Sequence, residues 1–220
     1  REAHIRFLAP FFIRTAENIN LKDKDIQFIF GLSPFTNIFK IQELLDTAAI
    51  KVRIISKGAL KYLKTSNDLE ILVIDKMPYD AMNVADLIIT VPGTNTSEAA
   101  ALGKPMLALV PFNDTSIYIF DGILGILASS PFIGKQVKKL AVYTLNKIIK
   151  FVALPNIKAK EMIVPEMRGY LSPENVANKA INMLLDSAYL QGMSTRLKSL
   201  FGSKGASQKI ADEIVRVLSK

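Results

Sequence analysis

The sequence predicts an α/β protein: a doubly wound parallel sheet with helices on both faces, followed by helices at the carboxyl end. Two observations predict it. Apolar runs of strand length alternate along the chain with segments of helical periodicity. The apolar runs are continuous, as in strands that are buried on both faces of a parallel sheet.

The elements follow in order. Residues 1–18 are predicted to form a helix because Ile5, Leu8, Phe12 and Ala16 recur at helical spacing. The predicted strands are 25–32, 51–56, 69–75, 86–90 and 105–110, and the helices between them are 35–49, 79–85 and 95–102. Three helices end the chain, at 172–186, 189–201 and 206–220. Ser172 before Pro173 is a favourable N-cap for the first of these. Four aromatic residues are expected in the core: Phe28, Phe30, Phe35 and Phe39.

Composition limits the classes of function. The chain has 220 residues, a formal net charge of +8, no cysteine and one histidine, His4. Disulfides, thiolate metal sites and a cysteine nucleophile are therefore excluded. The basic charge favours an anionic partner, such as a nucleotide, a phospholipid surface or a nucleic acid. The lysines are scattered without interleaved aromatic residues, so nucleic-acid binding has little support.

A candidate binding loop lies in VPGTNTSEAAALGKPMLALVPF, residues 91–112. Gly93 follows the strand at 86–90, where ligands of open α/β sheets are bound. A glycine allows a sharp turn and a close approach to a ligand. Thr94, Asn95 and Thr96 then supply backbone N–H groups and polar side chains at a helix N-terminus, which suits a phosphate. Glu98 could accept hydrogen bonds from a ribose diol.

An ordinary strand-to-helix turn explains the same residues, with Glu98 stabilising the helix dipole. Both interpretations stay open on the pattern alone. The loop is not a P-loop, because no Gly-Lys-Ser/Thr follows the glycine.

Three blocks together resemble the lipid-A-disaccharide synthase family, two-domain glycosyltransferases of the GT-B type. The first is the loop just described, with Gly-Lys-Pro-Met after its helix. The second is ALPNIKAKEMIVPEMRGYLSPENVA, residues 153–177, with Leu-Pro-Asn followed by Val-Pro-Glu. The third is the start, where residues 1–5 are similar to the helix that follows a Pro-Gly-Ser turn in the family. The chain is thus expected to be the carboxyl-terminal half, beginning inside a phosphate-binding turn.

The resemblance implies a Rossmann-like domain that holds the UDP of a donor sugar, with no metal cofactor. Its implied transfer moves an acylated glucosamine to a lipid-phosphate acceptor in lipid A biosynthesis. The catalytic residues are expected in the amino-terminal half, so this half alone should bind UDP-sugar without turnover. The nucleotide-binding positions that we predict are Arg1, Met77, Gly93, Thr94, Asn95, Thr96, Glu98 and Asn156.

Five residues, at four places in the chain, depart from the family pattern. Pro92 replaces a serine and removes one N–H donor; Pro111-Phe112, His4 and Gly169 replace a Tyr-Arg pair, an acidic residue and a glutamine. These departures keep alternatives open. One is a noncatalytic or degenerate module for nucleotide or membrane binding. Another is a GT-B glycosyltransferase or UDP-sugar epimerase with a different substrate.

The nucleotide-binding domain is expected to span residues 1–170, with the last helices, 171–220, packing on it or extending it. An insertion at 113–150 combines an apolar stretch with a basic helix carrying Lys135, Lys138 and Lys139. That combination suits an anionic membrane surface, and a core or interdomain helix with a solvated lysine face explains it equally well. We expect a cytoplasmic protein, peripheral to the inner face of the cytoplasmic membrane if the insertion binds lipid.

Overall fold

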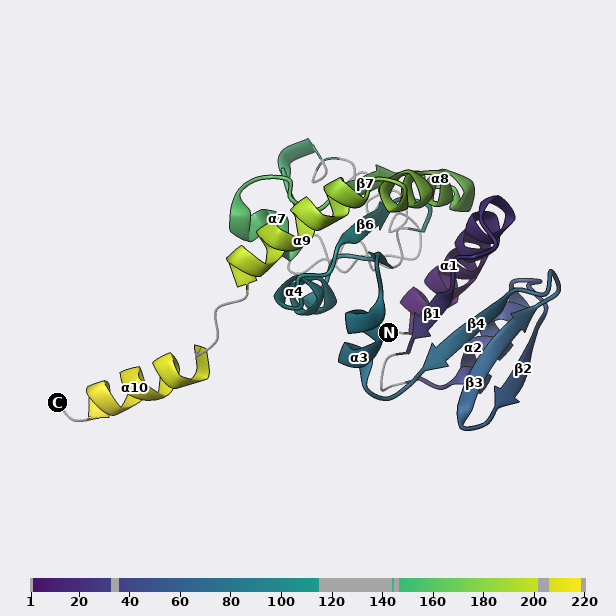
Figure 1. Ribbon diagram of the computed structural model, residues 1–220, viewed down its shortest axis with the longest axis horizontal. Helices are drawn as coiled ribbons and strands as arrows, with labels where there is room; N and C mark the ends of the chain where they lie inside the picture. Colours follow the sequence, from purple (N-terminus) through teal and green to yellow (C-terminus); the bar gives the residue numbers. More distant parts are fainter. Residues whose placement is uncertain (1, 33–35, 115–143, 145–146, 202–205, 219–220) are drawn as a thin grey trace, which may run out of the picture.

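The computed structural model describes residues 2–32, 36–114, 144, 147–201 and 206–218. These residues form eight helices and seven strands, in the alternating order that the sequence predicts for most of the chain (Figure 1). The helices are α1 (Glu2–Lys22), α2 (Ile38–Thr47), α3 (Pro78–Val84), α4 (Thr94–Ala101), α7 (Leu154–Ala159), α8 (Pro173–Leu184), α9 (Ser187–Phe201) and α10 (Ala206–Leu218). The strands are β1 (Phe28–Gly31), β2 (Val52–Lys57), β3 (Leu60–Thr65), β4 (Glu70–Ile74), β5 (Ile88–Thr90), β6 (Met106–Pro111) and β7 (Glu166–Gly169).

The strands form two sheets rather than one. The first has the order β1-β4-β3-β2, and β3 runs antiparallel to both β2 and β4. The second has the order β5-β6-β7 and is parallel throughout. The prediction of an entirely parallel sheet is therefore wrong for the first sheet. The cause is the β2–β3 hairpin, which turns at Gly58 with φ of 61° and reverses the chain within two residues.

The second sheet is centred on β6, whose six residues are all buried. Its apolar side chains pack with residues of α1, α4, α8 and α9 in one core cluster. A second cluster joins α1 and α2 to the first sheet. α1 also packs against α8, and α4 packs against α7 and α9. Helices thus cover the central strand, as its continuous apolar run predicts.

The four aromatic residues expected in the core differ in their burial. Phe28 and Phe30 are partly buried and pack against the core of the first sheet. The prediction for Phe39 is wrong, because its side chain is 63% exposed. Phe39 lies on the outer side of α2, where Lys61 Nζ is 5.5 Å from its ring centroid. Phe35 is outside the described residues.

Of the carboxyl-terminal helices, α8 and α10 begin within one residue of the prediction, and α9 begins two residues earlier than predicted. Ser172 caps α8, and its Oγ accepts a hydrogen bond from the Asn175 N–H at 3.1 Å. α9 packs against α4, α7 and α8, whereas α10 projects away from the other elements (Figure 1). None of the helices in the described ranges is both long enough and apolar enough to cross a bilayer.

Candidate functional site

The predicted binding loop lies at the carboxyl end of β5, where α4 begins. Gly93 precedes the helix with φ of 174°, which is extended backbone open to any residue. The reason for glycine is therefore space rather than a special backbone angle. A Cβ atom at Gly93 would lie 2.9 Å from Asn95 Oδ1. A side chain at position 93 would therefore displace the Asn95 side chain from the first turn of α4.

Asn95 and Thr96 hold the loop in place. The Asn95 amide donates to Thr90 Oγ1 at the end of β5, and its Oδ1 accepts from the Thr96 N–H at 3.1 Å. The Thr96 hydroxyl is buried and donates to the Gly93 carbonyl at 2.6 Å. Both side chains therefore stabilise the turn from inside. Their predicted contact with nucleotide stays a prediction.

Three backbone donors at this end of α4 are available. Within the described part of the chain, no hydrogen bond uses the N–H groups of Gly93, Thr94 or Asn95. Such groups, together with the helix dipole, attract anions. Thr94 is exposed, and Glu98 follows it four residues later on the same side of the helix. Among the described residues the Glu98 carboxylate has neither an ion pair nor a hydrogen bond, so it is available to a ligand.

Met77 lies apart from this loop, after β4 of the other sheet. It is the N-cap of α3, with φ of 56° and a side chain that is 69% exposed. α3 contacts α4, so the two loops belong to neighbouring helices. A left-handed non-glycine residue is uncommon, and here it turns the chain from the strand into Pro78.

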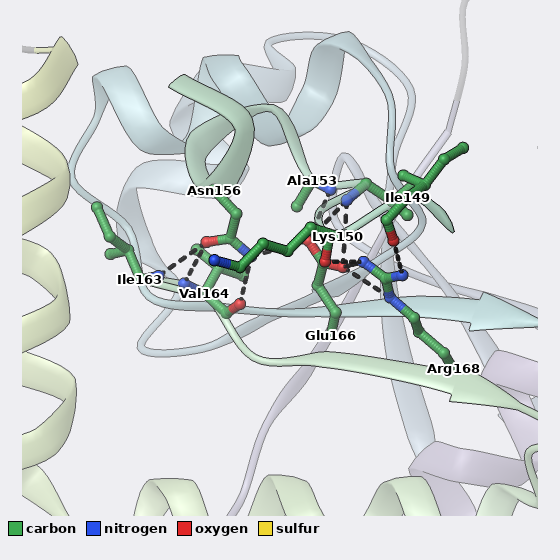
Figure 2. Close-up of polar contacts among 9 residues, drawn as sticks. Ile149, Lys150, Ala153, Asn156, Ile163, Val164, Glu166 and Arg168 are labelled. Atoms are coloured by element: carbon green, nitrogen blue, oxygen red, sulfur yellow. Dashed lines mark hydrogen bonds and ion pairs between the residues drawn. The ribbon is translucent and has the colours of Figure 1, made fainter. Parts of the chain in front are cut away.

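Asn156 is fully buried at the third position of α7, and four hydrogen bonds use its amide (Figure 2). Its Oδ1 accepts from the Ile163 and Val164 N–H groups, both at 2.8 Å. Its Nδ2 donates to the Val164 carbonyl at 2.7 Å and to Glu166 Oε1 at 2.8 Å. The amide has two donors and two lone pairs, so these bonds use its full capacity. Asn156 acts here as an internal brace, and its predicted contact with a nucleotide stays a prediction.

Glu166 continues this network on β7, with a side chain that is 0% exposed. It accepts hydrogen bonds from the Val152 and Ala153 N–H groups and forms an ion pair with Arg168. Burial acts to raise the pKa of the Glu166 carboxyl. The bonds from Ala153, Asn156, Val152 and Arg168 outweigh burial and hold that pKa below its ordinary value.

Arg168 links the same network to the chain that enters α7. Its Nη1 donates to the Ile149 carbonyl and its Nη2 to the Lys150 carbonyl, each at 2.8 Å (Figure 2). Glu166 and Arg168 were missed as site residues. Their signal was opposite charges two residues apart in a strand, which places both side chains on one face.

A crevice of about 1200 Å³ lies between α1, α8 and the facing edges of β1 and β5. Among residues 90–98, which contain the predicted loop, Thr90 alone lines this crevice. Its walls combine apolar side chains such as Ile19, Phe28 and Ile89 with polar and charged ones such as Asn20, Asp25 and Glu70. We base the candidate site on the start of α4 because the unoccupied donors and the free carboxylate converge there.

Some predicted residues fall outside the described residues. Arg1 is one of them, and so are the predicted membrane contacts Lys135, Lys138 and Lys139. Most of the 113–150 insertion falls outside as well. One anchor at its start is described: Asn113 Nδ2 donates to the Leu171 carbonyl, and Asn113 Oδ1 accepts from the Leu171 N–H, both at 2.9 Å.

Comparison with curated proteins finds similar chains along the whole sequence. The lipid-A-disaccharide synthase of Geobacter sulfurreducens is 25% identical over 224 residues, covering 100% of this chain and 47% of its own length. That of Nitrosococcus oceani is 27% identical over 222 residues, covering 99% and 46%. That of Aeromonas hydrophila is 23% identical over 224 residues, covering 100% and 48%. The chain spans about half the length of the curated relatives it matches.

The family model described as lipid-A-disaccharide synthetase matches residues 1–126, which is more than half of the chain. The match includes α1, the first sheet, and the candidate site from Gly93 to Glu98. This chain belongs to the lipid-A-disaccharide synthetase family.

Proposed function

We propose that this chain is the carboxyl-terminal, donor-binding half of a glycosyltransferase that uses a UDP-sugar. One observation carries the proposal: at the N-terminus of α4, three N–H groups and the Glu98 carboxylate one turn further along have no partner among the described residues. The N–H groups of Gly93, Thr94 and Asn95 would bind the diphosphate. Glu98, one turn further along the same side, would accept hydrogen bonds from the ribose hydroxyls.

The whole enzyme would transfer an acylated glucosamine from UDP to a lipid-phosphate acceptor. The proposal rests on membership of the family and on relatives that are named lipid-A-disaccharide synthase. The other half of such an enzyme would supply the catalytic base and most of the acceptor site. This half would then bind UDP and would not turn over by itself.

The fold supports a Rossmann-like, GT-B-type domain. Phe28 of β1 and Ile89 of β5 pack against the same core cluster, formed by Ile19, Ala177 and Ala180. We propose that the two sheets act as the two halves of one doubly wound domain over residues 1–170, which residues 171–220 extend. Met77 and the start of α4 would then follow parallel strands of the two halves, as nucleotide-binding loops do.

Calorimetric titration of the chain with UDP, and with ADP for comparison, tests the proposal. We expect UDP to bind more tightly than ADP. Glu98→Ala should weaken UDP binding by about tenfold or more, because a hydrogen bond to a charged group contributes about 1.5–3 kcal/mol.

Glu174→Ala is the matched control. Glu174 is an exposed glutamate in the first turn of α8, far along the chain from the site. It should leave UDP affinity unchanged. Failure of a folded sample to bind UDP, or an equal loss in both variants, would contradict the donor-site proposal.

A further inference from the structure

The β2–β3 hairpin leaves one strand edge of the first sheet uncovered. β2 is the last strand in the order β1-β4-β3-β2, and it lies at the outer side of that sheet (Figure 1). Its six residues pair with β3 on one side. Among the described residues, no strand pairs with its other side. An unpaired strand edge is a ready template for a further extended chain.

The register of the hairpin shows which backbone groups of β2 face outward. The residues that flank the two-residue turn at 58–59 form a hydrogen-bonded pair, and the same pattern recurs at every second residue. Val52, Ile54 and Ser56 therefore direct their N–H and C=O groups away from β3. The Val52 carbonyl agrees with this assignment, because it accepts from Gln42 Nε2 at 3.0 Å. Within the described part of the chain, the outward groups of Ile54 and Ser56 have no backbone partner.

The side chains of β2 alternate between two faces of the sheet. Val52 and Ile54 pack in the core cluster that α1 and α2 share with the first sheet. Arg53, Ile55 and Lys57 therefore point to the opposite face, where Ile55 is half-buried and the two cations are exposed. A strand added at this edge would meet an apolar side chain between two positive charges.

Charge selects the kind of partner. The segment 51–65 has no acidic residue and five basic ones: Lys51, Arg53, Lys57, Lys61 and Lys64. Lys57 and Lys64 form ion pairs with acidic residues outside this segment, whereas Lys51 and Arg53 form none among the described residues. Arg53 also lies directly opposite Lys64 in the register, and like charges in that position destabilise a sheet. The uncompensated charge at the edge therefore favours an acidic partner.

A second copy of the chain suits this edge poorly. Antiparallel pairing of two β2 strands about Ile55 would place Arg53 of one copy beside Lys57 of the other. Those like charges would oppose each other across the new pair of strands.

We propose that the outer edge of β2 binds an acidic, extended segment of a partner protein as an added strand. The N–H and C=O groups of Ile54 and Ser56 would hold the backbone of that segment. An apolar residue of the segment would lie beside Ile55, and an acidic residue two positions away would lie beside Arg53. The proposal goes beyond nucleotide binding and does not depend on it.

Fluorescence anisotropy of the whole chain with a labelled peptide, Ser-Val-Thr-Glu-Thr-Glu-Ser, tests the proposal. Bound antiparallel to β2, its valine would lie beside Ile55 and its first glutamate beside Arg53. We expect saturable binding that weakens as salt is raised. A second peptide, with lysine in place of both glutamates, should bind much more weakly.

Two variants of β2, each with a matched control, separate the backbone contact from the charge. Ser56→Pro should weaken peptide binding by about tenfold or more, because it removes an outward N–H at an edge position that tolerates proline. Ser56→Ala keeps that N–H and should bind normally. Arg53→Gln should weaken binding by about three- to fivefold, whereas Arg216→Gln, which removes an exposed arginine of α10, should leave it unchanged. Circular dichroism of all four should match the unchanged chain.

The proposal is overturned if the folded chain does not bind the acidic peptide. It is also overturned if Ser56→Pro binds as tightly as Ser56→Ala, or Arg53→Gln as tightly as Arg216→Gln. Equal binding of the lysine peptide, or full competition by an oligodeoxynucleotide, would show a different kind of site and would overturn it too. UDP titration of the same variants separates this result from the donor-site proposal, because UDP affinity should be unchanged.

Discussion

Replacing Asn156 by alanine tests whether this residue braces the fold. The substitution leaves the Ile163 N–H, the Val164 N–H and the Val164 carbonyl without their partner. Each buried polar group left unpaired costs about 1–3 kcal/mol, and water can satisfy part of that loss. We therefore expect Asn156→Ala to lower the free energy of unfolding by about 3–5 kcal/mol. That is a large part of the roughly 5–15 kcal/mol typical of a domain.

Urea unfolding followed by far-ultraviolet circular dichroism measures this change, and its midpoint should fall by about 1 M or more. Asn175→Ala is the control, because Asn175 is also the third residue of its helix, α8, yet is exposed. It should change stability by less than about 0.5 kcal/mol. Equal stability of the two variants, with UDP binding lost only in Asn156→Ala, would refute the bracing role and favour a ligand contact.

Three further predictions concern stability. Because the folded pKa of Glu166 is lowered, its carboxylate stabilises the fold fully above the ordinary pKa of 4.5, and this stabilisation is lost as pH falls through the folded pKa. Urea unfolding from pH 7 to pH 3 should show the free energy of unfolding falling with pH. Glu166→Gln should make that fall shallower. Gly103 and Gly58 both have positive φ, but only at Gly103 would a Cβ atom lie 2.3 Å from Lys198 Cγ. Gly103→Ala should therefore lower the thermal unfolding temperature more than Gly58→Ala does. An equal fall in unfolding temperature would contradict that contact. Ser172→Ala should lower the unfolding free energy by about 1 kcal/mol through the lost N-cap of α8, and an unchanged urea midpoint would show that the cap contributes nothing.

Local patterns predicted most elements and the candidate loop. Continuous apolar runs identified β1, β2, β4, β5 and β6, although β6 alone of these five strands is buried along its whole length. The β3 strand was missed because lysines at 61 and 64 interrupt its apolar residues, although Leu63 is fully buried. β7 was missed because Glu166 and Arg168 make it look polar. The two charges pair with each other, and their other partners, such as Asn156 and the Ile149 carbonyl, come from outside the strand.

The sequence by itself determined the family resemblance, the alternation of strands and helices, and the position of Gly93 at a strand-to-helix junction. These features depend on residues that are close together in the chain. Only the tertiary structure decided that Thr96 faces the core, that Asn156 uses its whole amide internally, and that the Glu98 carboxylate has no partner among the described residues. Hydrogen-bond partners such as Arg168 and Ile149, 19 residues apart, meet through packing. Sequence patterns report periodicity, whereas the use of each polar group depends on which neighbours packing brings within 3 Å or so.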